Sequence, residues 1–458
     1  MNGRGICWDA KVGLLLMMAV GMGWSQTEPA AERSSVQEVA AAELPYTEPL
    51  TPPSFLTGDR PSLTFTSEVE ADNLISGGLQ FTGTYDDNVF PIGNSRQSDL
   101  SYLVAPSLEL RRSTARWQSR MAFYPGFTVQ QKYGERNQSA YNLDFDTTLQ
   151  ASPHVAVRVR DYFDRATSLF AGLLDNSLSP GFDPARVGNQ AVITPLATRT
   201  GNNSAADVNY RLGKNSVMGV GATYYFENYG DAGASSPALV DTRSFSAGSF
   251  YAHQFDNQQW AGASYNFQRL NFEPGSRTTV QRFLLFYAVP VAQQVTLSLW
   301  GGPQYNTSGF SGGTAASVAS PWSGAGGVSL AWQGQRTSLS AEFNRRISDG
   351  GGLAQAVTLQ QVNAEVRRRL SQRWTMNLGM SYGDSDPLLS QAGSGYGRVR
   401  TLSVMAGLER VVNNHLRILM QYGRDRQEYD KAVRVLPNTN RNRAWATVSY
   451  TFTRPLGR

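Results

Sequence analysis

The residues with the greatest capacity for chemistry in this 458-residue chain are three histidines, His154, His253 and His415. A histidine can act as a general base beside a serine nucleophile, or bind a metal together with Cys, Asp or Glu. None of the three has such a residue at metal-ligand spacing, and no nucleophile motif surrounds His253, which we place near the middle of a strand. We therefore predict no catalytic residue, no metal site and no cofactor.

Charged residues at alternate positions of predicted strands are the second group of candidates. Successive side chains of a strand point to opposite faces, and these charges share the face opposite the apolar residues. Our candidates for lining a pore are Arg120, Asp144, Asp146, Arg158, Arg160, Arg211, Glu342, Arg346, Glu365, Arg367, Arg369 and Arg417, and Glu109, Asp207, Arg441 and Arg443 lie on the same face. Charges at this density require water or partners. They indicate an aqueous lumen with a modest preference for anions, or arginines that pair with neighbouring acids and brace the wall.

The elements that position these charges are amphipathic strands. From Trp374 to Tyr382, the apolar residues Met376, Leu378 and Met380 alternate with polar or small ones such as Asn377. An apolar stripe with an aromatic ring at each end is expected where a lipid-facing strand meets the headgroups on both sides of a membrane. No segment after the amino-terminal region approaches the roughly 18 uncharged apolar residues of a membrane helix.

The connections between the strands alternate in character along the chain. Short polar turns such as Gly213–Asn215 interleave with longer loops rich in Gly, Ser, Asn and Asp, and their number implies about eighteen strands with both termini on the short-turn side. A soluble propeller or sandwich gives no reason for this alternation. We therefore predict an all-β fold, a transmembrane antiparallel β-barrel from Leu74 to about Phe452 whose first and last strands pair.

The longest predicted loop, Ser168–Gly201, differs from the others because it carries apolar clusters near both ends. Its polar middle contains Asp175, Asp183 and Arg186. We expect the apolar clusters to dock inside the barrel mouth, so that the polar middle forms a constriction. The alternative is a flap on the surface.

The amino-terminal region divides into two parts before the barrel. Residues 1–25 have a charged leader, an apolar run and small residues at a cleavage position, which predicts a signal peptide. Residues 26–73 are rich in Ala, Glu, Pro, Ser and Thr and predict a flexible periplasmic segment, leaving 74–458 for the barrel. The single cysteine, Cys7, offers no disulfide framework, and a net charge of +5 is too mild to indicate nucleic acid.

Two short motifs carry a resemblance to a known family. They are Tyr85-Asp86-Asp87-Asn88-Val89-Phe90 in the first strand and loop, and Tyr450-Thr451-Phe452-Thr453-Arg454-Pro455-Leu456-Gly457-Arg458 at the end of the chain. With the barrel pattern between them, the chain resembles β-barrel porins associated with bacterial exopolysaccharide production and secretion. The resemblance implies an outer-membrane barrel of Gram-negative type, with polysaccharide transport as one context. An acidic loop tip is the alternative interpretation of the Asp86-Asp87 motif.

The primary functional prediction is an outer-membrane channel for small hydrophilic solutes or for polysaccharide secretion, without covalent chemistry. The first alternative is a barrel sealed by its loops that acts as a surface receptor or secretion accessory. An outer-membrane hydrolase is a third, which the histidine pattern disfavours. The expected partners are outer-membrane lipid, the outer-membrane assembly machinery and a small solute or polysaccharide; the sequence leaves the oligomeric state open.

Overall fold

A computed structural model describes residues 73–89, 96–134, 137–167, 198–230, 239–255, 259–273, 275–310, 321–353, 355–389, 397–430 and 438–456. They form eighteen antiparallel strands in a single sheet. The strands are β1 (Leu74–Asp86), β2 (Asp99–Ser113), β3 (Trp117–Gln130), β4 (Gln138–Ser152), β5 (Val155–Thr167), β6 (Thr198–Arg211), β7 (Ser216–Gly230), β8 (Asp241–Gln254), β9 (Trp260–Glu273), β10 (Ser276–Ala292), β11 (Val295–Phe310), β12 (Trp322–Gln333), β13 (Thr337–Ser348), β14 (Val357–Arg369), β15 (Trp374–Pro387), β16 (Val399–Val411), β17 (Leu416–Tyr429) and β18 (Thr439–Pro455).

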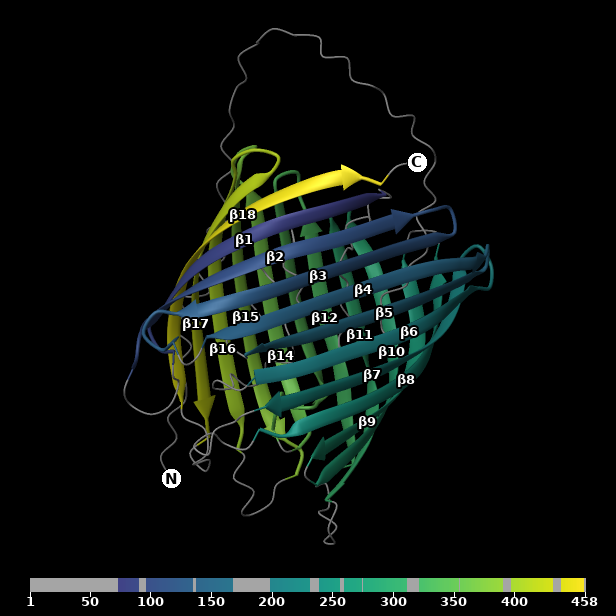
Figure 1. Cartoon of the computed structure of the whole chain (residues 1–458). Helices are drawn as coiled ribbons and strands as arrows, with labels where there is room; N and C mark the ends of the chain where they lie inside the picture. The colour runs from purple at the N-terminus through teal and green to yellow at the C-terminus, as the bar shows by residue number, and fades with distance from the viewer. Residues whose placement is uncertain are drawn as a thin grey trace, which may run out of the picture. The chain divides into compact units, whose positions relative to one another are not determined.

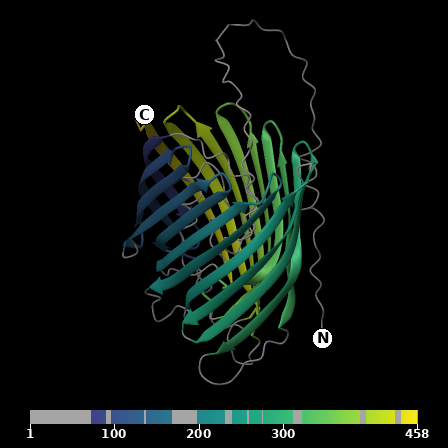
Figure 2. The ribbon, with the colours of Figure 1, turned by 90° about the vertical axis from the view of Figure 1, so that its right-hand side faces the viewer.

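The sheet closes on itself, because every strand pairs with its neighbours in sequence and β1 also pairs with β18. The closing register runs from Leu74 opposite Pro455 to Asp86 opposite Arg443. Figure 1 shows the two end strands side by side, and Figures 1 and 2 show the strands running obliquely around the barrel. The predicted fold class, the strand number and the pairing of the first and last strands are confirmed. Closure leaves no unpaired strand edge along this seam.

The alternation of side chains divides the wall into an outer and an inner face. On β1, Leu79 and Phe81 are about half exposed, whereas Gln80 and Thr82 between them are buried. On β15, Leu378 and Met380 are exposed in the same way. Since β-branched and aromatic residues fill most of the outer positions, these segments have both the period and the composition of strands.

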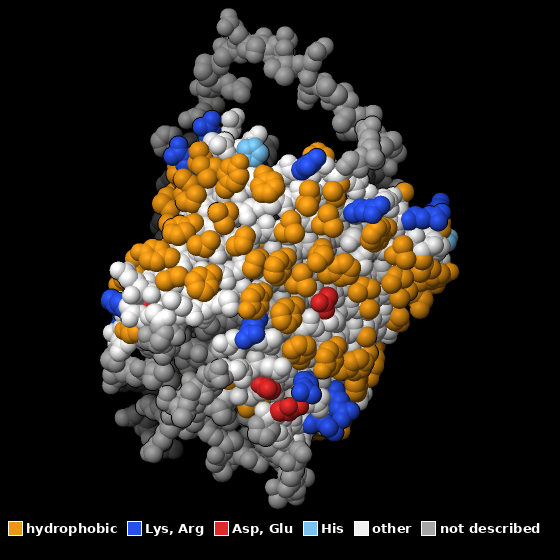
Figure 3. Space-filling view, in the orientation of Figure 1, with side chains coloured by type: hydrophobic (Ala, Val, Ile, Leu, Met, Phe, Trp, Pro, Cys, Tyr) orange, Lys and Arg blue, Asp and Glu red, His pale blue; other side chains and the backbone are white. Residues whose placement is uncertain are grey.

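The outer face carries a broad apolar band. Figure 3 shows orange side chains covering the side of the barrel nearest the viewer, with few charged side chains among them. Aromatic residues lie toward the ends of many strands, among them Trp117 and Phe127 on β3 and Tyr450 on β18. An exposed apolar band with aromatic rims is the surface of a barrel that sits in a lipid bilayer. Among the described residues, no helix has the length and apolar character needed to cross a membrane.

Candidate functional site in the barrel interior

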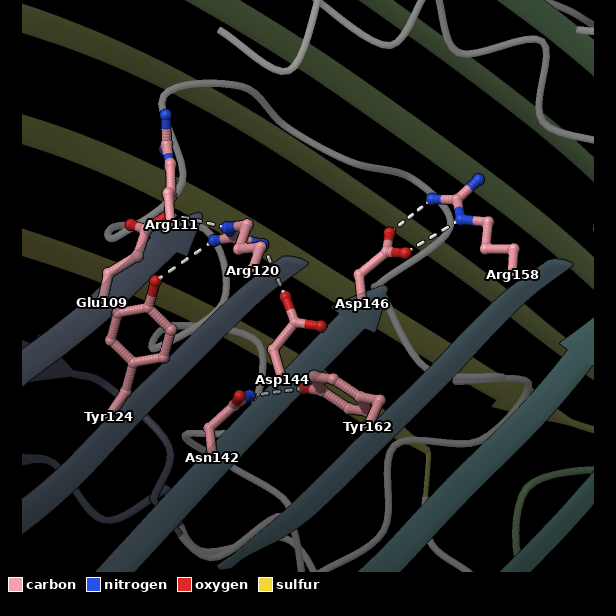
Figure 4. Close-up of polar contacts among 9 residues, drawn as sticks. All are labelled: Glu109, Arg111, Arg120, Tyr124, Asn142, Asp144, Asp146, Arg158 and Tyr162. Carbon is pink, nitrogen blue, oxygen red and sulfur yellow. Dashed lines mark hydrogen bonds and ion pairs between the residues drawn. The ribbon is translucent and has the colours of Figure 1, made fainter. Parts of the chain in front are cut away.

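Ion pairs join the inner faces of β2 to β5 (Figure 4). Arg120 on β3 donates to Glu109 on β2 and to Asp144 on β4, each at 2.7 Å. Arg111 donates to the same Glu109 oxygen at 2.6 Å, and the Arg120 guanidinium also approaches the Tyr124 hydroxyl at 3.4 Å. One guanidinium therefore links three neighbouring strands, because charge-assisted hydrogen bonds run in both directions from it.

The pairs continue onto β5 and β6. Arg158 makes a two-pronged contact with Asp146, with Nε donating to Oδ1 at 2.9 Å and Nη2 donating to Oδ2. Arg160, two residues further along β5, donates to Asp207 on β6 at 3.4 Å. We call the inner faces of β2 to β6, with these ion pairs, the charged wall. Its arginines are partly exposed, with 21% of the Arg120 side chain and 35% of the Arg158 side chain accessible.

A second ionic cluster lies nearer the loop ends of β5 to β7, and the sequence analysis missed it. Arg199 donates to Asp164 at 2.6 Å and lies 3.5 Å from Glu227. Tyr229 donates to Glu227 at 2.7 Å, and Tyr225 donates to the other oxygen of the same carboxylate. Arg199 was missed because the loop was predicted to extend to Gly201, whereas β6 begins at Thr198. If the alternation of faces had been followed back to the start of β6, it would have placed Arg199 on the same face as Asp207.

The seam between β17, β18 and β1 is held by two further pairs. Arg441 binds Asp86, with Nε 2.6 Å from Oδ2, and Arg443 donates to Asp425 at 2.7 Å. Asp87 accepts hydrogen bonds from the Asn442 backbone at 2.7 Å and from its side chain at 2.6 Å. The Asp86-Asp87 motif thus attaches the end of β1 to β18. This favours a structural role for the motif at the seam over a ligand site.

These contacts add charges to the inner face on which the expected preference for anions was based. The sequence argument compared arginines with a smaller number of acids on the inner face, but it omitted Asp86, Asp164, Glu227 and Asp425. Each of these four acids contacts an arginine. The sequence argument also omitted Arg111, Arg199 and Arg282 on the same face, so these acids alone do not set the balance of charge and the preference for anions stays a prediction. The pairs themselves give the bracing interpretation of the arginines its strongest support.

The remaining predicted residues share the inner parity but do not form one cluster. Glu342 on β13 accepts from the Asn344 amide at 3.0 Å, and Arg417 on β17 lies 3.7 Å from Glu409 on β16. Arg346 is buried near the loop end of β13. The others are Arg211 at the end of β6 and Glu365, Arg367 and Arg369 on β14. They are distributed around the barrel, so a role for each in lining a pore stays a prediction.

A different kind of inner surface lies on β7 to β12. Phe250, Phe286 and Trp300 pack with Val217 and Ala252 into one buried apolar cluster. We call these inner faces the aromatic wall. The polar parity predicted from the sequence did not include them, so the interior is less uniform than expected.

Glycines on neighbouring strands make room for these rings. A Cβ at Gly219 would lie 2.4 Å from the Phe250 ring, a Cβ at Gly262 would lie 2.3 Å from the Phe286 ring, and a Cβ at Gly327 would lie 2.3 Å from the Trp300 ring. Every one of these distances is shorter than a carbon–carbon contact allows. Each ring therefore lies against the wall where the next strand has no side chain, which is the usual reason for a glycine inside a strand.

The connection between β13 and β14 folds into the barrel. β13 pairs with β12 only as far as Arg345, whereas its pairing with β14 continues to Ser348. From Ile347 to Val357 every described residue is buried, and Gly350, Gly351 and Gly352 have φ values of 77°, 61° and 92°. Positive φ is readily available only to glycine, so this run allows the sharp turn that directs the loop inward.

The inward loop Ser348–Ala356 is anchored to strands on the far side of β11 and β12. Arg282 on β10 donates to the Ile347 carbonyl at 2.7 Å, and the Val240 amide beside β8 donates to the Gly352 carbonyl at 3.1 Å. Ile347 and Ala356 also pack against Leu270, Phe272 and Val280 of β9 and β10. Contacts on both sides of β11 and β12 mean that the loop spans the inner faces of these two strands.

The sequence analysis predicted a different constriction. Its residues Asp175, Asp183 and Arg186 lie outside the described residues. The glycine-rich segment that does reach the interior was predicted only as one of several ordinary loops. Its signal was a run of three glycines between two strands, which is common to many exposed turns.

One of the three histidines contacts a serine, which the sequence did not indicate. Ser216 Oγ on β7 lies 2.8 Å from His253 Nδ1 on β8, close to the short-turn end of both strands. His253 is the last residue but one of β8, so its predicted position near mid-strand is wrong. In the part of the chain that the structure describes, no carboxylate hydrogen-bonds the ring of His253, and no group of His, Cys, Asp and Glu could hold a metal. A serine and histidine without an orienting acid form an incomplete triad.

Comparisons with known proteins find similarity only in structure. No protein-family model and no curated protein matches the chain. Pseudomonas aeruginosa OpdQ shows 12% identity and a TM-score of 0.43 over 83% of this chain and 99% of that chain. Acinetobacter baumannii OccAB3 shows 10% identity and a TM-score of 0.40 over 83% of this chain and 99% of that chain. P. aeruginosa OccK2 (OpdF), solved in complex with glucuronate, shows 9% identity and a TM-score of 0.42 over 83% of this chain and 98% of that chain. At these values the similarities assign neither family nor function to the chain.

Proposed function

We propose that this chain is an outer-membrane β-barrel channel for small hydrophilic solutes in a Gram-negative-type bacterium. The observation that carries the proposal is the closed eighteen-stranded sheet with an apolar outer band and a charged inner wall. In hydrocarbon every backbone group must find a partner within the protein, which a closed barrel achieves. A barrel of 16 to 18 strands is also wide enough to enclose water.

The inward loop Ser348–Ala356 supports a channel that is narrowed near its loop end. The Ile347 carbonyl directly before it accepts from Arg282, and its Gly352 carbonyl accepts from the Val240 amide, so its position is fixed by hydrogen bonds as well as by apolar contacts. Since it leaves β13 at the loop end and contacts β9 and β10 inside the barrel, it narrows the entrance that a solute meets on the loop side. We therefore assign to this loop the constriction that the sequence argument placed at Asp175, Asp183 and Arg186.

Single-channel conductance in a planar bilayer tests the proposal. The wild-type protein should conduct, and deletion of Asp349–Gly352 should raise the conductance because it shortens the segment that narrows the entrance. Arg282→Gln should raise conductance or its fluctuations, since it removes the donor to the Ile347 carbonyl. Arg277→Gln is the matched control, because Arg277 lies on the same strand but is exposed and contacts Asn271.

The rival proposal is a sealed barrel that acts as a receptor or secretion accessory. It predicts no conductance from the wild-type protein and none from the correctly folded deletion variant. That result would reject the channel. A hydrolase would instead show turnover of lipid or peptide substrates that Ser216→Ala abolishes, because among the described residues Ser216 has the hydroxyl that hydrogen-bonds a histidine ring.

Passage of polysaccharide is the narrower form of the proposal, and only the family resemblance supports it. The acidic motif that carries part of that resemblance is occupied at the seam by Arg441 and Asn442. Addition of oligosaccharides of increasing length to a conducting bilayer tests this form. Length-dependent block of the current is the expected result, and an unchanged current with every oligosaccharide would limit the proposal to smaller solutes.

A further inference from the structure

Two arginines and a tryptophan lie together on the outer face near the short turns. Trp374 is the first residue of β15, and its parity is that of Leu378, which is exposed on the apolar band. Arg410 of β16 lies opposite Trp374 in the register, and its guanidinium carbon lies 5.3 Å from the centre of the Trp374 ring. Arg368 of β14 lies opposite Met376, which has the same parity as Trp374. All three side chains therefore face outward at the edge of the apolar band.

No acidic residue of the described strands balances these two arginines. The nearest acids in the sequence, Glu365 and Glu409, have the opposite parity, and Glu409 lies 3.7 Å from the inner Arg417. Neither Arg368 nor Arg410 forms an ion pair with a carboxylate of the described residues, and both side chains are exposed. Two like charges on either side of one strand repel each other, so an anion between them lowers their energy.

The indole N–H of Trp374 also lacks an acceptor within the part of the chain that the structure describes. Two other tryptophans have one: Trp117 Nε1 donates to the Thr147 hydroxyl and Trp445 Nε1 donates to the Gln421 side-chain oxygen, each at 2.7 Å. An indole can only donate, and so can a guanidinium. The surface therefore presents donors and positive charge without an acceptor of its own.

We propose that this outer surface, formed by Arg368, Trp374 and Arg410, binds the phosphate of an anionic phospholipid in the leaflet on the short-turn side. A tryptophan at the end of an apolar stripe lies at the level of the lipid headgroups. The charged acceptor at that level is the lipid phosphate, which a guanidinium binds through two parallel N–H···O bonds. The stacking of Arg410 on the ring orients its guanidinium before the lipid binds.

The spacing of the surface fits one headgroup with its acyl chains. Arg368 and Arg410 are two strands apart and offset by two residues, so their Cα atoms are roughly 12 Å apart. Both side chains are long enough to reach a phosphate above Trp374 from opposite sides. The acyl chains of the same lipid then follow Leu378 and Met380, which are exposed on the apolar band. A soluble anion would use only the donors, whereas a phospholipid uses the donors and the adjoining apolar surface.

Native mass spectrometry of the full-length protein in mixtures of phosphatidylglycerol and phosphatidylcholine tests the proposal. The wild-type protein should retain the anionic lipid preferentially. The double variant Arg368→Gln with Arg410→Gln should weaken this binding by about tenfold or more, since each arginine near an anionic headgroup contributes to it. The matched control is Arg345→Gln with Arg424→Gln, which removes two exposed outward arginines nearer the loops. Equal losses in the two double variants, or no loss in the first, would overturn the proposal.

Two further measurements identify the source of the phosphate and the role of the ring. An excess of inorganic phosphate should leave the lipid bound, and displacement of the lipid would overturn the proposal in favour of a soluble anion. Trp374→Phe keeps the ring but removes the N–H donor, so it should weaken binding by about threefold. Unchanged binding would reject the indole as a donor. The inference rests on the position of the barrel in a membrane and not on conductance, so its failure is distinguishable from failure of the channel proposal.

Discussion

The charged wall and the aromatic wall are built on the same kind of strand but hold the interior in different ways. On the charged wall, long side chains reach across two or three strands and remain partly exposed, as the 21% exposure of the Arg120 side chain shows. On the aromatic wall, rings lie over glycines of the next strand, and Phe286 is only 4% exposed. The first surface leaves room for water beside it, whereas the second is packed like a core. Truncations on the aromatic wall should therefore cost more stability than those on the charged wall, which has the more accessible charges.

Truncation of a ring on the aromatic wall should have the largest effect. Phe286→Ala removes a buried ring that packs with Phe250 and Trp300, and it should lower the free energy of unfolding by about 3 to 5 kcal/mol. Urea titration of the protein in lipid vesicles measures the change. A loss below about 1 kcal/mol would show that the ring is not part of a packed core.

An arginine introduced on the outer face should cost more stability than one introduced on the inner face of the same strand. Leu378→Arg should cost about 2 to 4 kcal/mol, because Leu378 is 41% exposed and faces the apolar band. Asn377→Arg, one residue earlier and on the inner face, should leave the unfolding free energy nearly unchanged. The same titration compares the two variants, and equal losses would contradict the assignment of faces on β15.

Filling one of the glycine positions should affect the aromatic wall alone. A Cβ at Gly262 would lie 2.3 Å from the Phe286 ring and 2.2 Å from the Tyr251 carbonyl. Gly262→Val should therefore cost about 1 to 3 kcal/mol or prevent assembly. Gly324→Val is the control, since a Cβ there meets nothing within 4 Å. The folded fraction after refolding into vesicles measures both, and similar fractions for the two would remove the proposed reason for Gly262.

The smallest stability effect is expected on the charged wall. Arg158→Ala should cost about 1 kcal/mol or less, because the pair with Asp146 is partly exposed. Its larger effect should be on ion selectivity: a conducting pore should shift toward cations in Arg158→Ala and toward anions in Asp146→Asn. Reversal potentials in a salt gradient measure this. Shifts of the same sign would show that the two residues do not face the ion path.

The sequence by itself determined the class of fold. A strand with one face toward lipid and the other toward the interior has apolar and polar residues at alternate positions, and this pattern is visible along the chain. Trp374, Met376 and Leu378 show it plainly, and the alternation of short turns with long loops gave the number of strands and the pairing of β1 with β18. Both signals are local, so they can be recognised without knowing which strands lie beside each other. The inner parity of Arg120 and Asp144 followed from the same pattern.

The tertiary structure alone decided which residues meet across the barrel. Asp86 reaches Arg441 only because the two ends of the sheet pair, and the loop Ser348–Ala356 is directed inward only because Arg282 and Val240 lie where it can reach them. The approach of Arg410 to the Trp374 ring depends on the register of β15 with β16. The alternation of residues identifies the face on which a side chain lies, but not which residue of another strand lies beside it. The register of the strands and the closure of the sheet determine these contacts.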